Sequence, residues 1–157
     1  MITTEQVYEI LSKVADPEIP VLTLEDLGVI RAINVVSNEE IEVKITPTYS
    51  GCPAMDVMAG DIRAALFVAG FTKINITHVI RPAWTTDWLS PKGREKLKKY
   101  GIAPPAATLS LQEAIVECPQ CGSKQTKIIS EFGSTSCKAL FQCENCLEPF
   151  DYFKCHR

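Results

Sequence analysis

The chain contains the stretch Cys118-Pro119-Gln120-Cys121-Gly122, which is followed by Cys143-Glu144-Asn145-Cys146. In each motif the backbone turns so that two thiolates converge on one ion, and two such motifs complete a tetrahedral site with four sulfur ligands. Residues 126–129 and 139–142, which lie between the motifs, fit the strands of a hairpin. The sequence therefore predicts a zinc-ribbon β module over residues 117–157. Its Zn²⁺ should be structural, because four sulfur ligands leave no open coordination position.

Other interpretations of the cysteines remain open. Four thiolates could also hold iron or an iron–sulfur cluster. A thioredoxin-like redox pair is disfavoured, because neither Cys-x-x-Cys motif follows a βαβ pattern. Cys137, Cys155 and His156 are left over. Cys155 and His156 could supply a replacement ligand or a second site, and Cys137 could interact with Cys155. Small buried side chains on the hairpin strands are the interpretation we favour.

The N-terminal part of the chain has the pattern of a small α/β (α+β) domain. The spacing of apolar residues predicts the order helix, strand, strand, helix, strand over residues 1–82. The predicted elements are a helix that begins at Thr3 and is ended by Pro17, strands over 29–36 and 41–45, a helix from Pro53 to Gly70, and a strand over 74–80.

Residues 83–116 connect the two parts. Trp84 and Trp88 lie in a short polar loop, where they could form a docking surface or, as we favour, a plug that joins the following helix to the sheet. A helix should follow from Pro91 to Tyr100, and the segment Ala103-Pro104-Pro105-Ala106-Ala107 should be a semi-rigid linker. Five of the helix's residues are basic, which is typical of the solvated side of a helix.

A second candidate site combines Cys52 with Asp16-Pro17-Glu18. Cys52 lies just before a predicted helix, whose N-terminus favours a thiolate that can ligate a metal or react. A buried, inert cysteine is an equally good interpretation. Asp16 and Glu18 could end the first helix or could serve as carboxylate ligands.

Composition and motifs exclude several classes of function. The 157 residues carry a net charge of −3, which argues against a nucleic-acid partner. Residues 1–5 lack the basic and apolar regions of a signal peptide, and no apolar run is long enough to cross a membrane. We therefore expect a cytoplasmic protein, in which seven cysteines indicate metal or thiol chemistry rather than disulfides. The absence of a catalytic motif and the presence of only two histidines predict that the chain is not an enzyme.

Several segments resemble known families. The α/β domain of iron–sulfur cluster assembly factors of the SufT type resembles this chain at Asp16-Pro17-Glu18-Ile19-Pro20, Leu27-Gly28-Val29-Ile30 and Thr46-Pro47-Thr48-Tyr49-Ser50-Gly51-Cys52-Pro53. The PaaD family, accessory subunits of the bacterial phenylacetyl-CoA epoxidase system, resembles it at residues 81–88, 101–105 and 150–156. The second resemblance extends over nearly the whole chain.

The resemblance implies a role beside an oxygenase that forms the ring 1,2-epoxide of phenylacetyl-CoA in aerobic phenylacetate degradation. Such a subunit would help to assemble an iron–sulfur or di-iron centre, with Cys52, Asp16 and Glu18 binding iron or a cluster transiently. Its partners would be the oxygenase or reductase subunits or iron–sulfur carrier proteins, and a homodimer is also conceivable. The alternatives are a structural or adaptor subunit without metal chemistry at Cys52, or an electron-transfer protein with iron held by the four cysteines.

Overall fold

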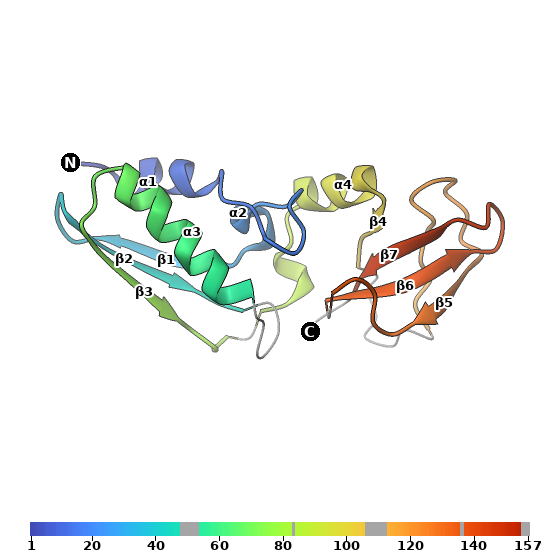
Figure 1. Ribbon diagram of the computed structural model, residues 1–157. Helices are drawn as coiled ribbons and strands as arrows, with labels where there is room; N and C mark the ends of the chain where they lie inside the picture. The colour runs from blue at the N-terminus through green and yellow to red at the C-terminus, as the bar shows by residue number, and fades with distance from the viewer. Residues whose placement is uncertain (48–53, 83, 106–112, 136, 155–157) are drawn as a thin grey trace. The chain divides into compact units, whose positions relative to one another are not determined.

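The computed structural model describes residues 1–47, 54–82, 84–105, 113–135 and 137–154, and the chain forms two compact units (Figure 1). The first comprises Met1–Trp84 and Trp88–Ser90, and the second comprises Thr85–Asp87 and Pro91–Arg157. No helix in the described ranges has the length and apolarity that crossing a membrane requires.

The first unit has the predicted order of elements, with one short helix added. The elements are α1 (Thr4–Leu11), α2 (Leu24–Leu27), β1 (Ile30–Val35), β2 (Glu40–Ile45), α3 (Ala54–Val68) and β3 (Lys73–His78). The sheet order is β1-β2-β3, with β1 and β2 antiparallel and β2 and β3 parallel. The hairpin and the crossover through α3 are therefore confirmed, and the fold class is mixed α/β as predicted.

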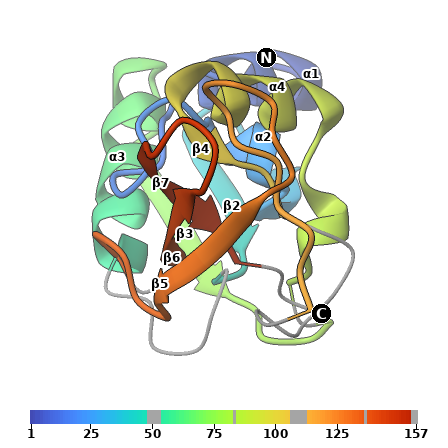
Figure 2. The ribbon, with the colours of Figure 1, turned by 90° about the vertical axis from the view of Figure 1, so that its right-hand side faces the viewer.

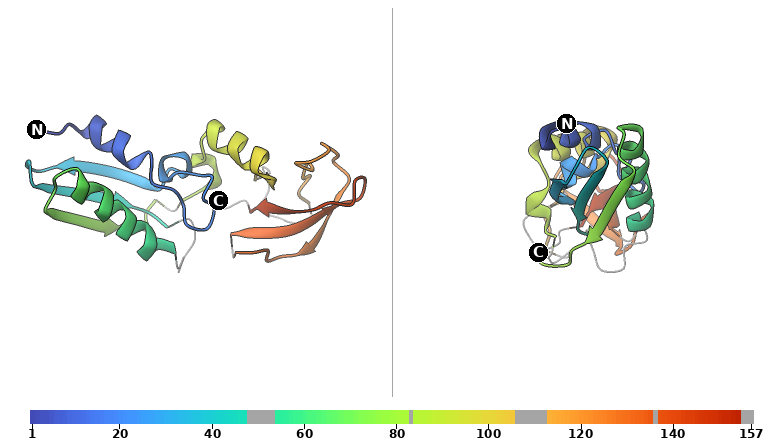
Figure 3. Two further views of the ribbon diagram at one scale, coloured as in Figure 1. Left: turned by 45° about the horizontal axis from the view of Figure 1, so that its top comes forward. Right: turned by 90° about the vertical axis from the view of Figure 1, so that its left-hand side faces the viewer.

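The core of this unit lies between one face of the sheet and the helices. On the central strand β2, Ile41, Val43 and Ile45 are fully buried, whereas the alternating Glu42 and Lys44 are exposed. Figure 3 shows α3 running along the sheet, and α3 buries Met58, Ile62 and Leu66. Burial of this apolar surface is the main stabilising contribution to such a unit.

The first helix is shorter than predicted. Thr3 and Gln6 form the expected capping box, in which each backbone N–H donates to the other residue's side chain. The helix ends at Leu11, however, and does not continue to Pro17. The chain after it pairs instead with the segment before α2, where the Leu24 N–H donates to the Val14 carbonyl at 2.9 Å. This tertiary pairing competes with the last helical turn and replaces it.

Helix α2 was not predicted, although its ends carry recognisable signals. Thr23 and Asp26 form a second capping box, and Gly28 ends the helix in the left-handed region with φ of 70°. A Cβ atom at position 28 would lie 3.1 Å from the Cβ of Trp88, so glycine also allows close packing there.

Both tryptophans pack within the first unit. Trp84 is 5% exposed, and its indole N–H donates to the Leu27 carbonyl at 2.6 Å. The guanidinium of Arg31 lies 3.9 Å from the centre of the Trp88 ring. Trp84 is therefore packed against the end of α2 within the first unit, and the predicted plug between the helix of residues 91–100 and the sheet stays a prediction.

The second unit is built on a four-stranded sheet (Figure 2). Its elements are α4 (Pro91–Tyr100), β4 (Ile102–Ala103), β5 (Thr126–Ser130), β6 (Lys138–Cys143) and β7 (Pro149–Phe153). The short helix η1 (Thr86–Trp88) is divided between the units, because its last residue, Trp88, belongs to the first. The strand order is β4-β7-β6-β5, and the predicted β5–β6 hairpin is confirmed. Strands β4 and β7 were not predicted, and Ala103, the first residue of the expected linker, lies in β4.

One face of this sheet forms a small aromatic core. Phe141 stacks on Phe150 with ring centres 6.1 Å apart and meets the edge of Tyr152 at 5.1 Å. Cys118 and Cys143 are buried in the same cluster. Two of the four motif cysteines are thus part of the core of the sheet.

Candidate metal centre

The four predicted cysteine ligands come together at one end of the second sheet. The Sγ atoms of Cys118, Cys121, Cys143 and Cys146 all lie within 4.8 Å of one another. The Cys118–Cys146 and Cys121–Cys143 sulfur pairs are 3.8 Å and 3.5 Å apart. Four sulfur ligands about 2.3 Å from one tetrahedral ion stand about 3.8 Å from each other. The site therefore fits a tetrahedral metal ion.

Backbone hydrogen bonds hold the two motifs in place. In the first, the Gly122 N–H donates to the Cys118 carbonyl at 2.9 Å, and the Cys118 N–H donates to the Ser123 carbonyl at 2.8 Å. Cys143 is the last residue of β6, and its N–H donates to the Glu148 carbonyl at 3.0 Å. The Glu144 N–H donates to the Gln125 carbonyl at 2.8 Å, which ties the second motif to the segment that follows the first.

The environment of Cys143 favours the thiolate that a metal requires. The backbone N–H groups of Asn145 and Cys146 both donate to its Sγ at 3.4 Å. The hydrogen bond from Cys146 is the largest influence, and without a metal ion the pKa of Cys143 is lowered to about 6 against the opposing effect of burial. For Cys146, a backbone hydrogen bond from Glu148 favours the thiolate, but burial and the neighbouring thiols raise its pKa to about 12. Four thiolates crowded together need a cation to balance their charge.

Each motif is closed by a residue in the left-handed region of φ. Gly122 follows Cys121 with φ of 76°, and Leu147 follows Cys146 with φ of 67°. Leu147 has the only positive φ among the described residues other than glycine. A branched side chain in this conformation costs roughly 1–2 kcal/mol. The two turns are therefore alike in shape, but only the first has the residue that the shape favours.

Exchanging the residue types at these two turns should change stability in opposite directions. Leu147→Gly should raise the free energy of unfolding of the ribbon by about 1 kcal/mol, because it removes the strain, and Leu147 is 67% exposed and contributes little burial. Gly122→Ala should lower it by a similar amount. Thermal unfolding of both variants, with zinc present, measures the difference. A destabilised Leu147→Gly variant would show that the leucine side chain matters more than its backbone strain.

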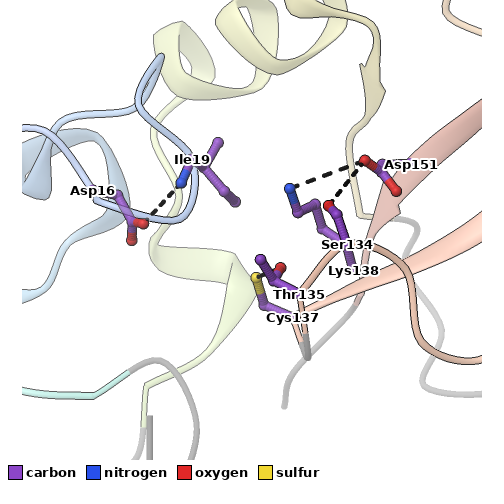
Figure 4. A network of polar contacts seen from close by, with 7 residues as sticks. All are labelled: Asp16, Ile19, Ser134, Thr135, Cys137, Lys138 and Asp151. Carbon is purple, nitrogen blue, oxygen red and sulfur yellow. Dashed lines mark hydrogen bonds and ion pairs between the residues drawn. The ribbon is translucent and has the colours of Figure 1, made fainter. Parts of the chain in front are cut away.

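Cys137 lies apart from the four-cysteine cluster. It is buried, and its Sγ lies 2.9 Å from the Thr135 Oγ1 (Figure 4). Near it, Lys138 and Asp151 form an ion pair with Nζ and Oδ2 4.0 Å apart, also drawn in Figure 4. Cys137 is thus buried, as the favoured interpretation has it, but it lies directly before β6 and not on a strand. Cys155 and His156 lie outside the described residues.

In the first unit, Asp16 organises its own loop. Its buried carboxylate accepts hydrogen bonds through Oδ1 from the Glu18 N–H at 2.7 Å and from the Ile19 N–H at 2.9 Å, the latter drawn in Figure 4. The Asp16 N–H donates to the Leu22 carbonyl at 2.8 Å, so the loop is closed on itself. Asp16 therefore does not end the first helix. Glu18 is half-buried, and Cys52 lies outside the described residues, so the grouping of these three remains a prediction.

Thr46 is a polar residue that the sequence analysis did not single out. It follows β2 and is buried, and none of the described residues forms a hydrogen bond with its Oγ1. Buried hydroxyl groups normally have a partner, and an exception calls for an explanation such as a ligand. A sequence feature that could have drawn attention to Thr46 is its position six residues before Cys52.

Comparison with known proteins assigns a family to each part. Residues 4–77 match an iron–sulfur cluster assembly protein family, and residues 102–154 match the PaaD zinc beta ribbon domain. A domain of unknown function, DUF59, from Bacillus anthracis shares the fold of the first part, with a TM-score of 0.55 and 24% identity over 59% of this chain and 89% of that one.

Two curated relatives extend this result. An Fe-S protein maturation auxiliary factor of Porphyromonas gingivalis is 33% identical over 60% of this chain and 90% of its own length. A protein of Escherichia coli (strain K12) that is named as one of the subunits of 1,2-phenylacetyl-CoA epoxidase is 50% identical over 96% of this chain and 92% of its own. The chain therefore belongs to the PaaD family and joins an iron–sulfur cluster assembly domain to a PaaD zinc beta ribbon.

Proposed function

We propose that the chain is a non-catalytic accessory factor of a phenylacetyl-CoA epoxidase system, and that it helps to assemble an iron–sulfur or di-iron centre of a partner subunit. The observation that carries this proposal is the union of an iron–sulfur assembly domain with a PaaD ribbon in one chain. The names of the two curated relatives support it: one is named as an epoxidase subunit, which fits the association with the epoxidase, and the other as a maturation factor, which fits the assembly role. The factor would act in the cytoplasm.

In this proposal the ribbon holds one structural zinc ion through Cys118, Cys121, Cys143 and Cys146. The sulfur spacing fits a tetrahedral ion, and zinc is favoured over iron because residues 102–154 match a zinc beta ribbon domain. Four protein ligands leave no position for water or substrate, so the ion would shape the ribbon and take no part in a reaction. The ribbon would then be available to recognise a partner subunit.

The metal cargo would be handled in the first unit. Cys52 would bind iron or a cluster transiently, assisted by Asp16 or Glu18. Two observations support this part of the chain as a site. Asp16 is held in place by its two backbone hydrogen bonds, and the hydroxyl of Thr46 is buried with no hydrogen-bond partner among the described residues. Buried groups without a partner and rigidly placed carboxylates are common where a ligand binds.

Replacing Cys52 by serine tests the proposal. In cells that produce the complete epoxidase system, Cys52→Ser should lower epoxidase activity and the cluster content of the reductase by about tenfold or more, as expected when a metal site loses a ligand. Cys137→Ser is the matched control, because Cys137 lies outside the four-cysteine cluster, and it should leave both quantities unchanged. Equal activity and cluster content in the Cys52→Ser cells would contradict the maturation role and favour an adaptor subunit.

A further inference from the structure

Helix α4 carries an excess of positive charge, which its own unit neutralises only in part. Three of its five basic residues, Arg94, Lys96 and Lys98, have interaction partners within the protein. Arg94 donates through Nη1 to the Pro105 carbonyl and through Nη2 to the Thr86 carbonyl, both at 3.1 Å. Lys98 forms an ion pair with Glu117 at 3.2 Å. These contacts fix the helix in the second unit.

Lys92 and Lys99 have no such role. Both are exposed, and the described residues place no hydrogen-bond or ion-pair partner on either ammonium group. They are seven positions apart, so they lie on the same side of the helix, two turns from each other. The buried residues Gly93 and Leu97 occupy a different side, which leaves the two lysines on the outer face.

The position of Lys92 is unfavourable for the helix itself. A cation in the last turn is stabilised by the helix dipole, which accounts for Lys98 and Lys99. Lys92, by contrast, lies in the first turn, where the dipole disfavours a cation, and that turn contains no acidic residue. The stability of the helix therefore does not explain a lysine at this position, whereas binding to an external partner would explain it.

An aromatic side chain borders this face on the side of Gly93, because Tyr100 is seven positions after that glycine. Tyr100 is 62% exposed, follows Lys99 directly and lies one turn after Lys96. Exposed tyrosines supply much of the binding energy at protein interfaces, whereas surrounding charges govern the approach of the partner. Helix α4 is held in place by its own unit and presents a tyrosine beside lysines. It therefore offers both a side chain that can supply binding energy and charges that can guide the approach of a partner.

Other classes of partner fit this face less well. A membrane-surface helix needs a free apolar side, whereas Leu97 of α4 is fully buried in the protein. Nucleic acid is disfavoured by the net charge of −3. A small anionic molecule would need a concave site, and the outer face of a single helix is convex.

We infer that Lys92, Lys99 and Tyr100 form a docking surface for an acidic patch on a protein partner. The inference rests on the proposed function in taking that partner to be a subunit of the epoxidase system. Lys92 and Lys99 attract the acidic patch at a distance, and Tyr100 packs into it after contact.

The two roles predict different kinetic changes in binding to the purified cognate epoxidase subunits. The double variant Lys92→Glu/Lys99→Glu should lower the association rate constant about tenfold at low salt, and the difference should vanish at high salt. Tyr100→Ala should raise the dissociation rate constant about tenfold with little change in association. Surface plasmon resonance at two salt concentrations measures both constants, and zinc content and circular dichroism verify that the variants are folded.

Matched controls come from the first unit. Lys13→Glu/Lys73→Glu makes the same change in net charge at two exposed lysines, and Tyr8→Ala removes an exposed tyrosine of α1; both should bind like the parent. Parent-like kinetics in the α4 variants, or equal slowing by the Lys13/Lys73 control, would overturn the docking surface while leaving the proposed function intact. If the parent protein binds none of the subunits, that result contradicts the proposed function, and it contradicts the docking surface as well.

Discussion

Replacing Cys118 by serine is expected to unfold the four-stranded sheet of the second unit while the first unit stays folded. Cys118 is fully buried and is one of the four proposed zinc ligands. Structural zinc sites supply about 10–16 kcal/mol of binding free energy, which is comparable to the whole stability of a domain. The variant should bind less than stoichiometric zinc. Limited proteolysis should cleave it within residues 113–154 and leave a resistant N-terminal fragment.

Cys137→Ser is the control for this experiment, since it changes another buried cysteine of the same unit without touching the cluster. It should keep its zinc and resist protease like the parent. A Cys118→Ser variant that is equally resistant would show that the aromatic core around Phe141 and Tyr152 suffices to fold the sheet. The ion would then not be the main source of its stability.

The second large effect is expected at Trp84. Trp84→Ala should lower the free energy of unfolding of the first unit by about 3–5 kcal/mol, because it leaves a large cavity and removes the hydrogen bond to the Leu27 carbonyl. Trp84→Phe keeps most of the ring volume and should cost about 1–3 kcal/mol, chiefly for the carbonyl left without its donor. Urea unfolding followed by circular dichroism measures both.

Zinc content provides the control for the tryptophan variants, because the four-cysteine site should retain its ion in both. If Trp84→Ala unfolds at the same urea concentration as the parent, the tryptophan does not stabilise the packing of the α2–β1 turn. In that case the alternative of a docking surface for this loop would have to be reconsidered.

The sequence predicted the parts of the fold that depend on local patterns. The β1–β2 and β5–β6 hairpins have alternating apolar residues and nearby turns, and α3 has a continuous apolar side. The cysteine motifs predicted the cluster, because a Cys-x-x-Cys turn brings its own two sulfur atoms together and the hairpin between the motifs joins the pairs.

The elements that were missed depend on distant partners or are very short. Strand β4 has two residues and exists through its pairing with β7, which lies far away in the sequence. Helix α2 has four residues, too few for an apolar periodicity, although its capping box and Gly28 were visible. The end of α1 was misplaced because the bond between Leu24 and Val14 is a tertiary contact that Pro17 does not reveal.

The candidate site divides in the same way. The spacing of the cysteines alone predicts the four-thiolate cluster of the ribbon. The hydrogen bonds of Asp16, by contrast, could be identified only from the structure. Sequence reasoning weighed helix termination against metal ligation for this residue, and the structure adds a third role, because its Oδ1 accepts two backbone N–H groups of its own loop. A contact between the Asp16 carboxylate and a metal cargo at Cys52 is compatible with this role and stays a prediction.

Zinc, iron and sulfide analysis of protein purified without oxygen tests the central claim, when the parent and Cys52→Ser are compared side by side. The claim predicts one zinc per chain in both proteins, and iron with sulfide in the parent only. Iron in place of zinc in both proteins would contradict a structural zinc ribbon and support electron transfer through the four cysteines. Zinc in both with equal iron, or with none, would contradict the binding of a metal cargo at Cys52.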